Sequence, residues 1–74
     1  MEYLKDFLNY TLKIAEGYNS QDIRTIFFNQ AFGAVSYFCW ANWKDGPEVE
    51  KQAMELWNNE YSEKFNELIK KAEQ

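Results

Sequence analysis

Hydrophobic residues recur at helical spacing in three stretches of the chain, and two short polar breaks separate these stretches. The breaks fall at residues 17–20 and 44–47. Apolar positions at i, i+3, i+4 and i+7 are typical of amphipathic α-helices. We therefore predict an all-α fold, a three-helix bundle that forms a single domain over residues 1–74. Its helices are expected at about residues 2–16, 21–43 and 47–72.

The first predicted helix shows the cleanest separation of apolar and polar faces. Its apolar side chains lie on one arc, and mostly charged or amide side chains occupy the opposite arc. A helix of this kind packs its apolar face on a core. The residues expected on this buried face are Leu4, Phe7, Leu8, Thr11, Ile14, Ala15 and Tyr18.

The second predicted helix is apolar around well over half of its circumference. No residue from Thr25 to Trp43 is charged. A helix that is apolar almost all round is usually a buried helix. We therefore expect it to be the central helix, covered by the first and third helices on different sides. Its two apolar stripes contain Ile23, Ile26, Phe27, Ala34, Phe38 and Ala41, and Phe28, Phe32, Val35 and Cys39.

The two breaks carry residues that start the next helix. Asn19 or Ser20 can cap the N-terminus of the second helix with a side-chain oxygen. In the second break, Gly46 suits the exit from a helix and Pro47 suits the first position of the next one. These signals predict where the second and third helices begin.

The third predicted helix is the longest, at about 26 residues or roughly 39 Å. Acidic residues crowd its first half and lysines its last turn, as the helix dipole favours. On a straight helix, Val49 and Leu56 project away from the apolar face and onto an acidic side. The expected apolar face contains Ala53, Met54, Trp57, Tyr61, Phe65, Leu68, Ile69 and Ala72.

An acidic row marks the other side of the third helix. Glu60, Glu63 and Glu67 share one face by the i, i+3, i+7 rule. A carboxylate-bound metal pair in a helical bundle needs Glu-x-x-His partners on neighbouring helices, and the chain contains no His. We expect a solvated acidic face and no metal site. Weak Mg²⁺ or Ca²⁺ contact, or docking of a basic partner, is the alternative.

The residues usually needed for catalysis are missing. The chain has one Cys and no His. A nucleophilic Cys39 needs a neighbouring base, usually His, and apolar surroundings disfavour its thiolate. The three Gly are isolated from one another, so no phosphate-binding loop is expected. We predict no catalytic residue, no cofactor and no enzymatic activity.

Net charge and the start of the chain bear on partners and compartment. Twelve acidic residues against eight basic ones give a net charge of −4 at pH 7. Nucleic-acid binders carry a basic patch, and helices that lie on membranes usually carry a basic polar face. We expect neither nucleic acid nor membrane as a partner. The first residues lack the basic start and apolar core of a secretory signal, so we expect a cytoplasmic protein.

Large apolar side chains exceed what one small core needs. The hydrophobic set makes up 46% of the chain and the aromatic set 19%, whereas single cores are marginal below about 80 residues. Tyr37, Trp40 and Trp43 lie close to the polar strip of the second helix. Three interpretations are open. The indoles cover the turn between the second and third helices as a lid, or they form a self-association or partner surface with Tyr37, to which Val49 and Leu56 are added, or they line a small-molecule pocket.

The function predicted from these features is a non-catalytic cytosolic protein-interaction module, a regulator, inhibitor or adaptor that acts through the aromatic helical surface. The small size and the apolar excess also predict a homodimer, with an unidentified protein partner as a further expectation. One alternative is a structural homo-oligomer with no other partner. A second alternative is a helical protein that binds a small molecule or, weakly, a metal ion.

Overall fold

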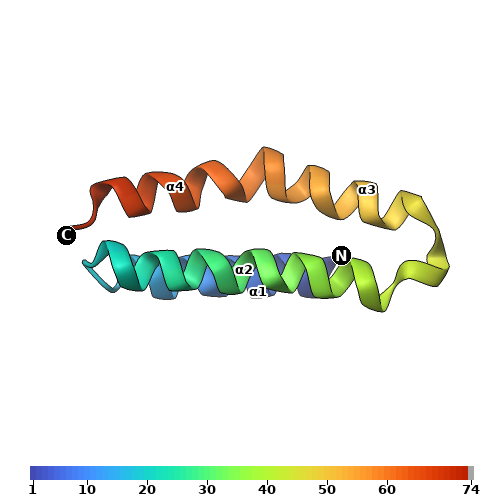
Figure 1. Ribbon diagram of the computed structural model, residues 1–74, viewed down its shortest axis with the longest axis horizontal. Coiled ribbons are helices and arrows are strands. Elements are labelled where there is room, and N and C mark those ends of the chain that lie inside the picture. Colours follow the sequence, from blue (N-terminus) through green and yellow to red (C-terminus); the bar gives the residue numbers. More distant parts are fainter. Residues whose placement is uncertain (74) are drawn as a thin grey trace.

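The chain forms three helical rods that lie side by side, with consecutive rods antiparallel (Figure 1). The computed structural model describes residues 1–73, so the last residue of the predicted domain lies outside the described part. The predicted all-α fold of three packed helices is confirmed. The elements are α1 (Glu2–Glu16), α2 (Gln21–Ala41), a 3-10 turn η1 (Trp43–Asp45), α3 (Pro47–Leu56), a π-helical turn η2 (Trp57–Tyr61) and α4 (Ser62–Lys71). We call the run from α3 through η2 to α4 the C-terminal helix.

Local capping residues set the starts of α2 and α3. The Ser20 hydroxyl accepts a hydrogen bond from the backbone N–H of Ile23 at 3.3 Å, which confirms the predicted cap of α2. Pro47 occupies the first turn of α3, also as predicted. The preceding Gly46 has φ 96°, a conformation that glycine adopts without the steric penalty of a Cβ.

The second helix ends earlier than the sequence predicted. α2 stops at Ala41 rather than at residue 43. The Asn42 side chain donates a hydrogen bond to the Phe38 carbonyl at 2.8 Å, and the Asn42 backbone N–H donates to the same carbonyl at 3.1 Å. These two bonds close the last turn of α2. Trp43 lies in the tighter turn η1 and does not continue the α-helix.

The C-terminal helix is interrupted by a π-helical turn, whereas the sequence predicted one continuous α-helix. Its core side chains Ala53, Trp57, Tyr61 and Phe65 are spaced four residues apart. In an α-helix each such step overshoots a full turn by about 40°, so the row would drift by about 120° over three steps. The π-helical turn η2 takes up this rotation by fitting an extra residue into one turn. All four side chains are therefore at most 3% exposed.

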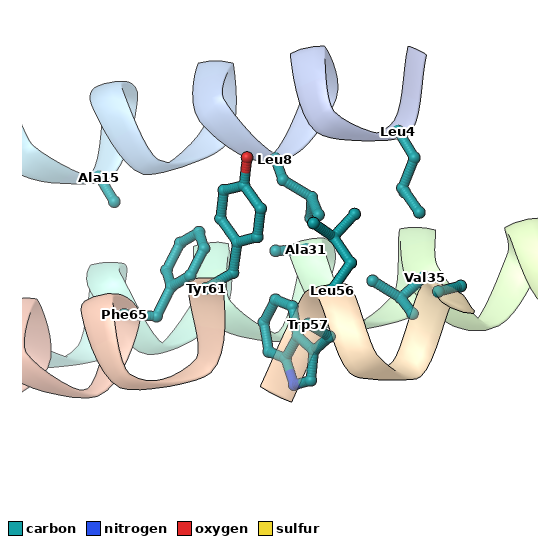
Figure 2. Close-up of a cluster of buried hydrophobic side chains, with 10 residues drawn as sticks. Leu4, Leu8, Ala15, Ala31, Val35, Leu56, Trp57, Tyr61 and Phe65 are labelled. Atoms are coloured by element: carbon teal, nitrogen blue, oxygen red, sulfur yellow. The ribbon is translucent and has the colours of Figure 1, made fainter. Parts of the chain in front are cut away.

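Aromatic rings from α2 and the C-terminal helix form the centre of the core. The rings of Trp57 and Phe65 stack with 5.8 Å between centroids. Phe28 of α2 meets both rings edge-on, at 5.5 and 6.2 Å. Stacked and edge-to-face pairs at these distances add stability beyond the burial of their area. Leu8 of α1 closes the cluster from the third side (Figure 2).

A buried arginine holds the end of the bundle where α1 and α4 both finish. The guanidinium of Arg24 donates to the carbonyls of Tyr18 and Leu68, both at 2.6 Å. It also donates to the carbonyls of Ala15 and Glu16, both at 3.1 Å. A positive charge is favourable at helix C-termini, where carbonyl groups lack partners within the helix. This role of Arg24 was not predicted from the sequence pattern.

Only the inner side of α2 is covered by the rest of the chain. α2 packs against α1 and against the C-terminal helix, as expected of a central helix. However, its buried residues are Arg24, Ala31 and Val35, and several large apolar residues on its other side are exposed. The prediction that α2 is buried almost all round is therefore wrong. Phe7 and Tyr18, which the sequence placed on the buried face of the first helix, are also exposed.

Candidate functional site

The largest aromatic side chains on the surface of α2 lie on one stripe that points away from the core. Ile26, Gly33, Tyr37 and Trp40 share this stripe by helical spacing, opposite the buried Val35. Ile26 is 54% exposed, Tyr37 66% and Trp40 67%. We call these four residues the outer face of α2. This face combines large apolar side chains with a stretch of chain that carries no charge.

The two indoles near the end of α2 do not act as a lid. Trp40 and Trp43 are each 67% exposed, which rules out the interpretation that they cover the core at the following turn. Tyr37 packs against Trp40 with 5.8 Å between ring centroids. The ammonium of Lys44 lies 5.8 Å from the Trp43 ring centroid, within cation–π range. Tyr37, Trp40 and Trp43 are thus available for contact with another molecule.

A second aromatic stripe on α1 borders the outer face of α2. Tyr3, Phe7 and Tyr10 follow each other at i, i+4 and i+7, and all three are exposed. Further along the same flank, Tyr18 stacks on Phe27 of α2 with 5.7 Å between centroids. This contact places the flank beside α2. We call Tyr3, Phe7 and Tyr10 the α1 stripe, and it widens the exposed apolar surface beyond α2.

The opposite flank of α1 faces the C-terminal helix. Its Asn9 side-chain oxygen accepts a hydrogen bond from the Tyr61 hydroxyl at 2.8 Å. The α1 stripe and the outer face of α2 therefore lie on the side of the α1–α2 hairpin that is turned away from the C-terminal helix. The sequence pattern did not assign Ile26, Gly33 or Phe7 to a surface, whereas Tyr3 and Tyr10 lie at the edge of the predicted apolar face of the first helix. The charge-free run from Thr25 to Trp43 was the signal that could have found the part on α2.

Leu56 does not belong to this surface. The sequence predicted that it projects from the C-terminal helix as a partner-binding residue, but it is 6% exposed and points into the same cluster as Leu8 (Figure 2). The extra residue in η2 shifts the helix phase by about 100°, so the face that meets the core before η2 differs from the face after it. Leu56 lies on the core face of α3. Val49, the other predicted partner residue on this helix, is half-buried.

The acidic row is exposed along the C-terminal helix, as its spacing predicted. Glu60, Glu63 and Glu67 line a surface hollow of about 350 Å³ together with Asn59 and Lys64. Lys64 brings a positive charge into the row, and its ammonium lies 5.7 Å from the Tyr61 ring centroid. Among residues 1–73, no group of three or more Asp, Glu or Cys side chains is arranged to hold a metal ion.

Two groups that could ionise are held in their neutral forms. Burial raises the pKa of the Cys39 thiol, and the charge of Glu50 raises it further. Burial also raises the pKa of the Tyr61 hydroxyl, with a second contribution from Glu60. A neutral thiol is a weak nucleophile. The neutral hydroxyl of Tyr61 donates its hydrogen bond to Asn9.

Ionisation of Tyr61 is expected to weaken the fold at high pH. Because folding raises the pKa of Tyr61, its contribution is present below pH 10, the ordinary Tyr pKa, and is lost as the pH rises through the folded value. Tyr61→Phe should lower the free energy of unfolding by about 1 kcal/mol at pH 8. The difference from the unsubstituted protein should shrink above pH 10. Urea unfolding at pH 8 and at about pH 10.5 measures both values.

A constant difference at the two pH values would contradict this account of Tyr61. Tyr3→Phe is the control, because the Tyr3 side chain is 91% exposed and its hydroxyl is not buried by the fold. The Tyr3 variant should match the unsubstituted protein at either pH.

Comparison with known proteins adds no functional assignment. No protein-family model, curated protein or solved structure matches the chain. None of the helices in residues 1–73 has the length and apolarity needed to cross a membrane. The main feature of the geometry is an exposed apolar surface on the α1–α2 hairpin.

Proposed function

We propose that the protein is a non-catalytic cytosolic interaction module that works by burying the outer face of α2 against a protein surface. The observation that carries this proposal is the exposure of Tyr37, Trp40 and Trp43 on a stretch that has no charged residue. Trp and Tyr are enriched at the cores of protein interfaces, and charged residues are depleted there. Large contiguous apolar patches on small proteins mark interaction sites.

The distribution of charge supports the same assignment. Most charged side chains lie on α1 and the C-terminal helix, and α2 contributes Asp22 and the buried Arg24. The C-terminal helix therefore keeps one side of the molecule hydrated while the α1–α2 side stays free to bind. The raised pKa of the Cys39 thiol and the absence of His from the sequence favour binding over catalysis.

Removal of the two exposed indoles should abolish binding without unfolding the protein. The paired substitutions Trp40→Ala and Trp43→Ala delete side chains that are two-thirds exposed, so the helical content should stay the same. Interface Trp residues often contribute 2 kcal/mol or more, so we expect cross-linked complexes to fall at least about tenfold. The readout is chemical cross-linking of the tagged protein in the cells that make it, quantified for all adducts, together with circular dichroism.

The matched control replaces two exposed residues of the C-terminal helix, Asn58→Ala with Asn66→Ala. This variant should form as many complexes as the unsubstituted protein. Unchanged cross-linking of the Trp variant would refute the proposal. A loss of helicity equal to the loss of cross-linking would refute it as well, because the indoles would then support the fold and not a surface.

A further inference from the structure

We infer that the surface that covers the outer face of α2 is a second copy of this chain. The two α2 helices would cross antiparallel, on a two-fold axis that passes beside Gly33. This inference rests on the proposed function, because it names the partner of the same surface. Four features of the outer face support it: its symmetry about Gly33, the open space at Gly33, its lack of charge and its area.

Two large apolar residues of the outer face, Ile26 and Trp40, are placed symmetrically about Gly33. Ile26 lies seven residues before Gly33 and Trp40 lies seven residues after it, on the same stripe. In an antiparallel crossing centred at Gly33, Ile26 of each copy therefore lies against Trp40 of the other. A two-fold interface requires this kind of self-complementary pairing. One dimer therefore contains two such contacts, and each contact buries one exposed Ile26 side chain against one exposed Trp40 side chain.

No close contact among residues 1–73 requires a glycine at position 33. It lies in the middle of α2, where glycine is less favourable than alanine by about 1 kcal/mol. A Cβ placed there would meet nothing within 4 Å in residues 1–73 beyond its own helical turn. The helix therefore gives up stability at a position where a side chain would fit. A glycine at this position is explained if a second helix packs there. The distance between packed helices depends on the side chains at the contact, so a position without a side chain lets the second helix approach closely.

The charge pattern favours a neutral partner surface. From Thr25 to Trp43 no side chain is charged. A partner that placed a charged group on this surface would lose the hydration of that charge without gaining an ion pair. A second copy presents the same neutral face. It also keeps the two C-terminal helices, which carry most of the acidic residues, on the outside of the assembly.

The exposed area suffices for a stable pair. At about 200 Å² for each large side chain, the exposed parts of Ile26, Tyr37, Trp40 and the adjacent Trp43 amount to roughly 500 Å². The neighbouring α1 stripe adds roughly 400 Å² by the same reckoning. Stable interfaces bury about 800 Å² on each partner. The outer face and the α1 stripe together reach this size.

The decisive variant is Gly33→Glu, tested by sedimentation velocity over a wide range of concentrations. In a single copy the new side chain enters open space, so thermal unfolding at high dilution should stay unchanged or occur at a higher temperature. In the dimer it places two like charges on the two-fold axis, and the dissociation constant should rise at least about tenfold. Asn66→Glu adds the same charge on the exposed side of α4 and should leave the dissociation constant unchanged.

Disulfide formation tests the register of the pair. In a Cys39→Ala background, Gly33→Cys should form a disulfide between chains, because the two positions face each other across the axis. Ile26→Cys should not, because antiparallel packing separates its two copies by about 21 Å. Strong cross-linking of the Ile26 variant would show a parallel pair and overturn the proposed packing.

A dimer that the Gly33→Glu substitution weakens supports the inference. A chain that stays monomeric at every concentration overturns it, and so does a dimer that this substitution leaves unaffected. The proposed function is judged separately. If the monomeric chain still forms cross-linked complexes that depend on Trp40 and Trp43, the surface binds another protein and only the second copy is excluded. If these complexes are absent as well, both proposals fail.

Discussion

Replacement of Arg24 with Met is expected to lower the free energy of unfolding by about 3 kcal/mol or more. Hydrogen bonds that involve a charged group contribute about 1.5–3 kcal/mol each, although their effects do not add fully. Arg24 donates four such bonds at the shared end of α1 and α4. Met fills a similar volume but donates none, so carbonyl groups in a largely buried site lose their partners.

Thermal and urea unfolding measure this effect directly. A domain of this size loses about 4–8 °C in Tm for each kcal/mol, so the Arg24→Met variant should unfold at least about 12 °C lower. Arg24→Lys should recover only part of the loss, because a single ammonium cannot reach four carbonyls that lie around a planar guanidinium. The exposed Lys51→Met is the control and should change stability by less than about 0.5 kcal/mol. Equal stability of the Arg24 and Lys51 variants would contradict the role given to Arg24.

The second large effect is expected at Phe65. Its side chain is fully buried, stacks on Trp57 and meets Phe28 edge-on. Truncation of a buried Phe to Ala typically lowers stability by about 3–5 kcal/mol, through lost burial and the cavity that remains. A chain of this length has a total stability of about 4–11 kcal/mol. Phe65→Ala should therefore remove a large share of the total free energy of unfolding.

Urea unfolding followed by Trp fluorescence measures this loss. Phe65→Leu keeps most of the volume and should lose less than about 1.5 kcal/mol. In dilute, monomeric protein, Tyr3→Ala removes a ring that is almost fully exposed and should have little effect. If the Phe65→Ala variant is as stable as the Tyr3→Ala variant, the aromatic cluster around Trp57 does not hold the fold together.

The sequence predicted the elements of this fold because the signals for them are local. Helical periodicity marked three helices, Ser20 marked the start of α2, and Pro47 marked the start of α3. Each of these signals depends on residues within one or two turns of each other. The same local rules also predicted the exposed acidic row on the C-terminal helix.

The features that the sequence did not predict depend on contacts between distant parts of the chain. The π-helical turn arises because Ala53, Trp57 and the aromatic residues after them must all meet the same core. A projection onto a straight α-helix does not take these long-range contacts into account. It therefore placed Leu56 on the exposed side of the C-terminal helix. Arg24 was missed because its acceptors are backbone carbonyls, which leave no pattern in the sequence.

Only part of the candidate surface was predicted from the sequence. The rest was not predicted because it also depends on contacts between helices. Periodicity shows that α2 is apolar on several sides, but it does not show how much of the helix its two neighbours can cover. Tyr37, Trp40 and Trp43 were recognised because they lie next to polar positions. Ile26 was assigned to the core because it shares a stripe with residues that do pack inward. Which apolar side of α2 remains exposed to solvent depends on the number and position of the helices packed against it, and the sequence pattern does not show this.

The central claim is that the outer face of α2 is covered when the protein works, and oxidation of the three Trp residues by hydroxyl radicals tests it most directly. Trp57 is 3% exposed and serves as an internal reference within the same chain. In dilute purified protein, Trp40 and Trp43 should oxidise many times faster than Trp57. In the cells that make the protein, their rates should fall towards the rate of Trp57. Equally fast oxidation of Trp40 and Trp43 in both settings would contradict the claim.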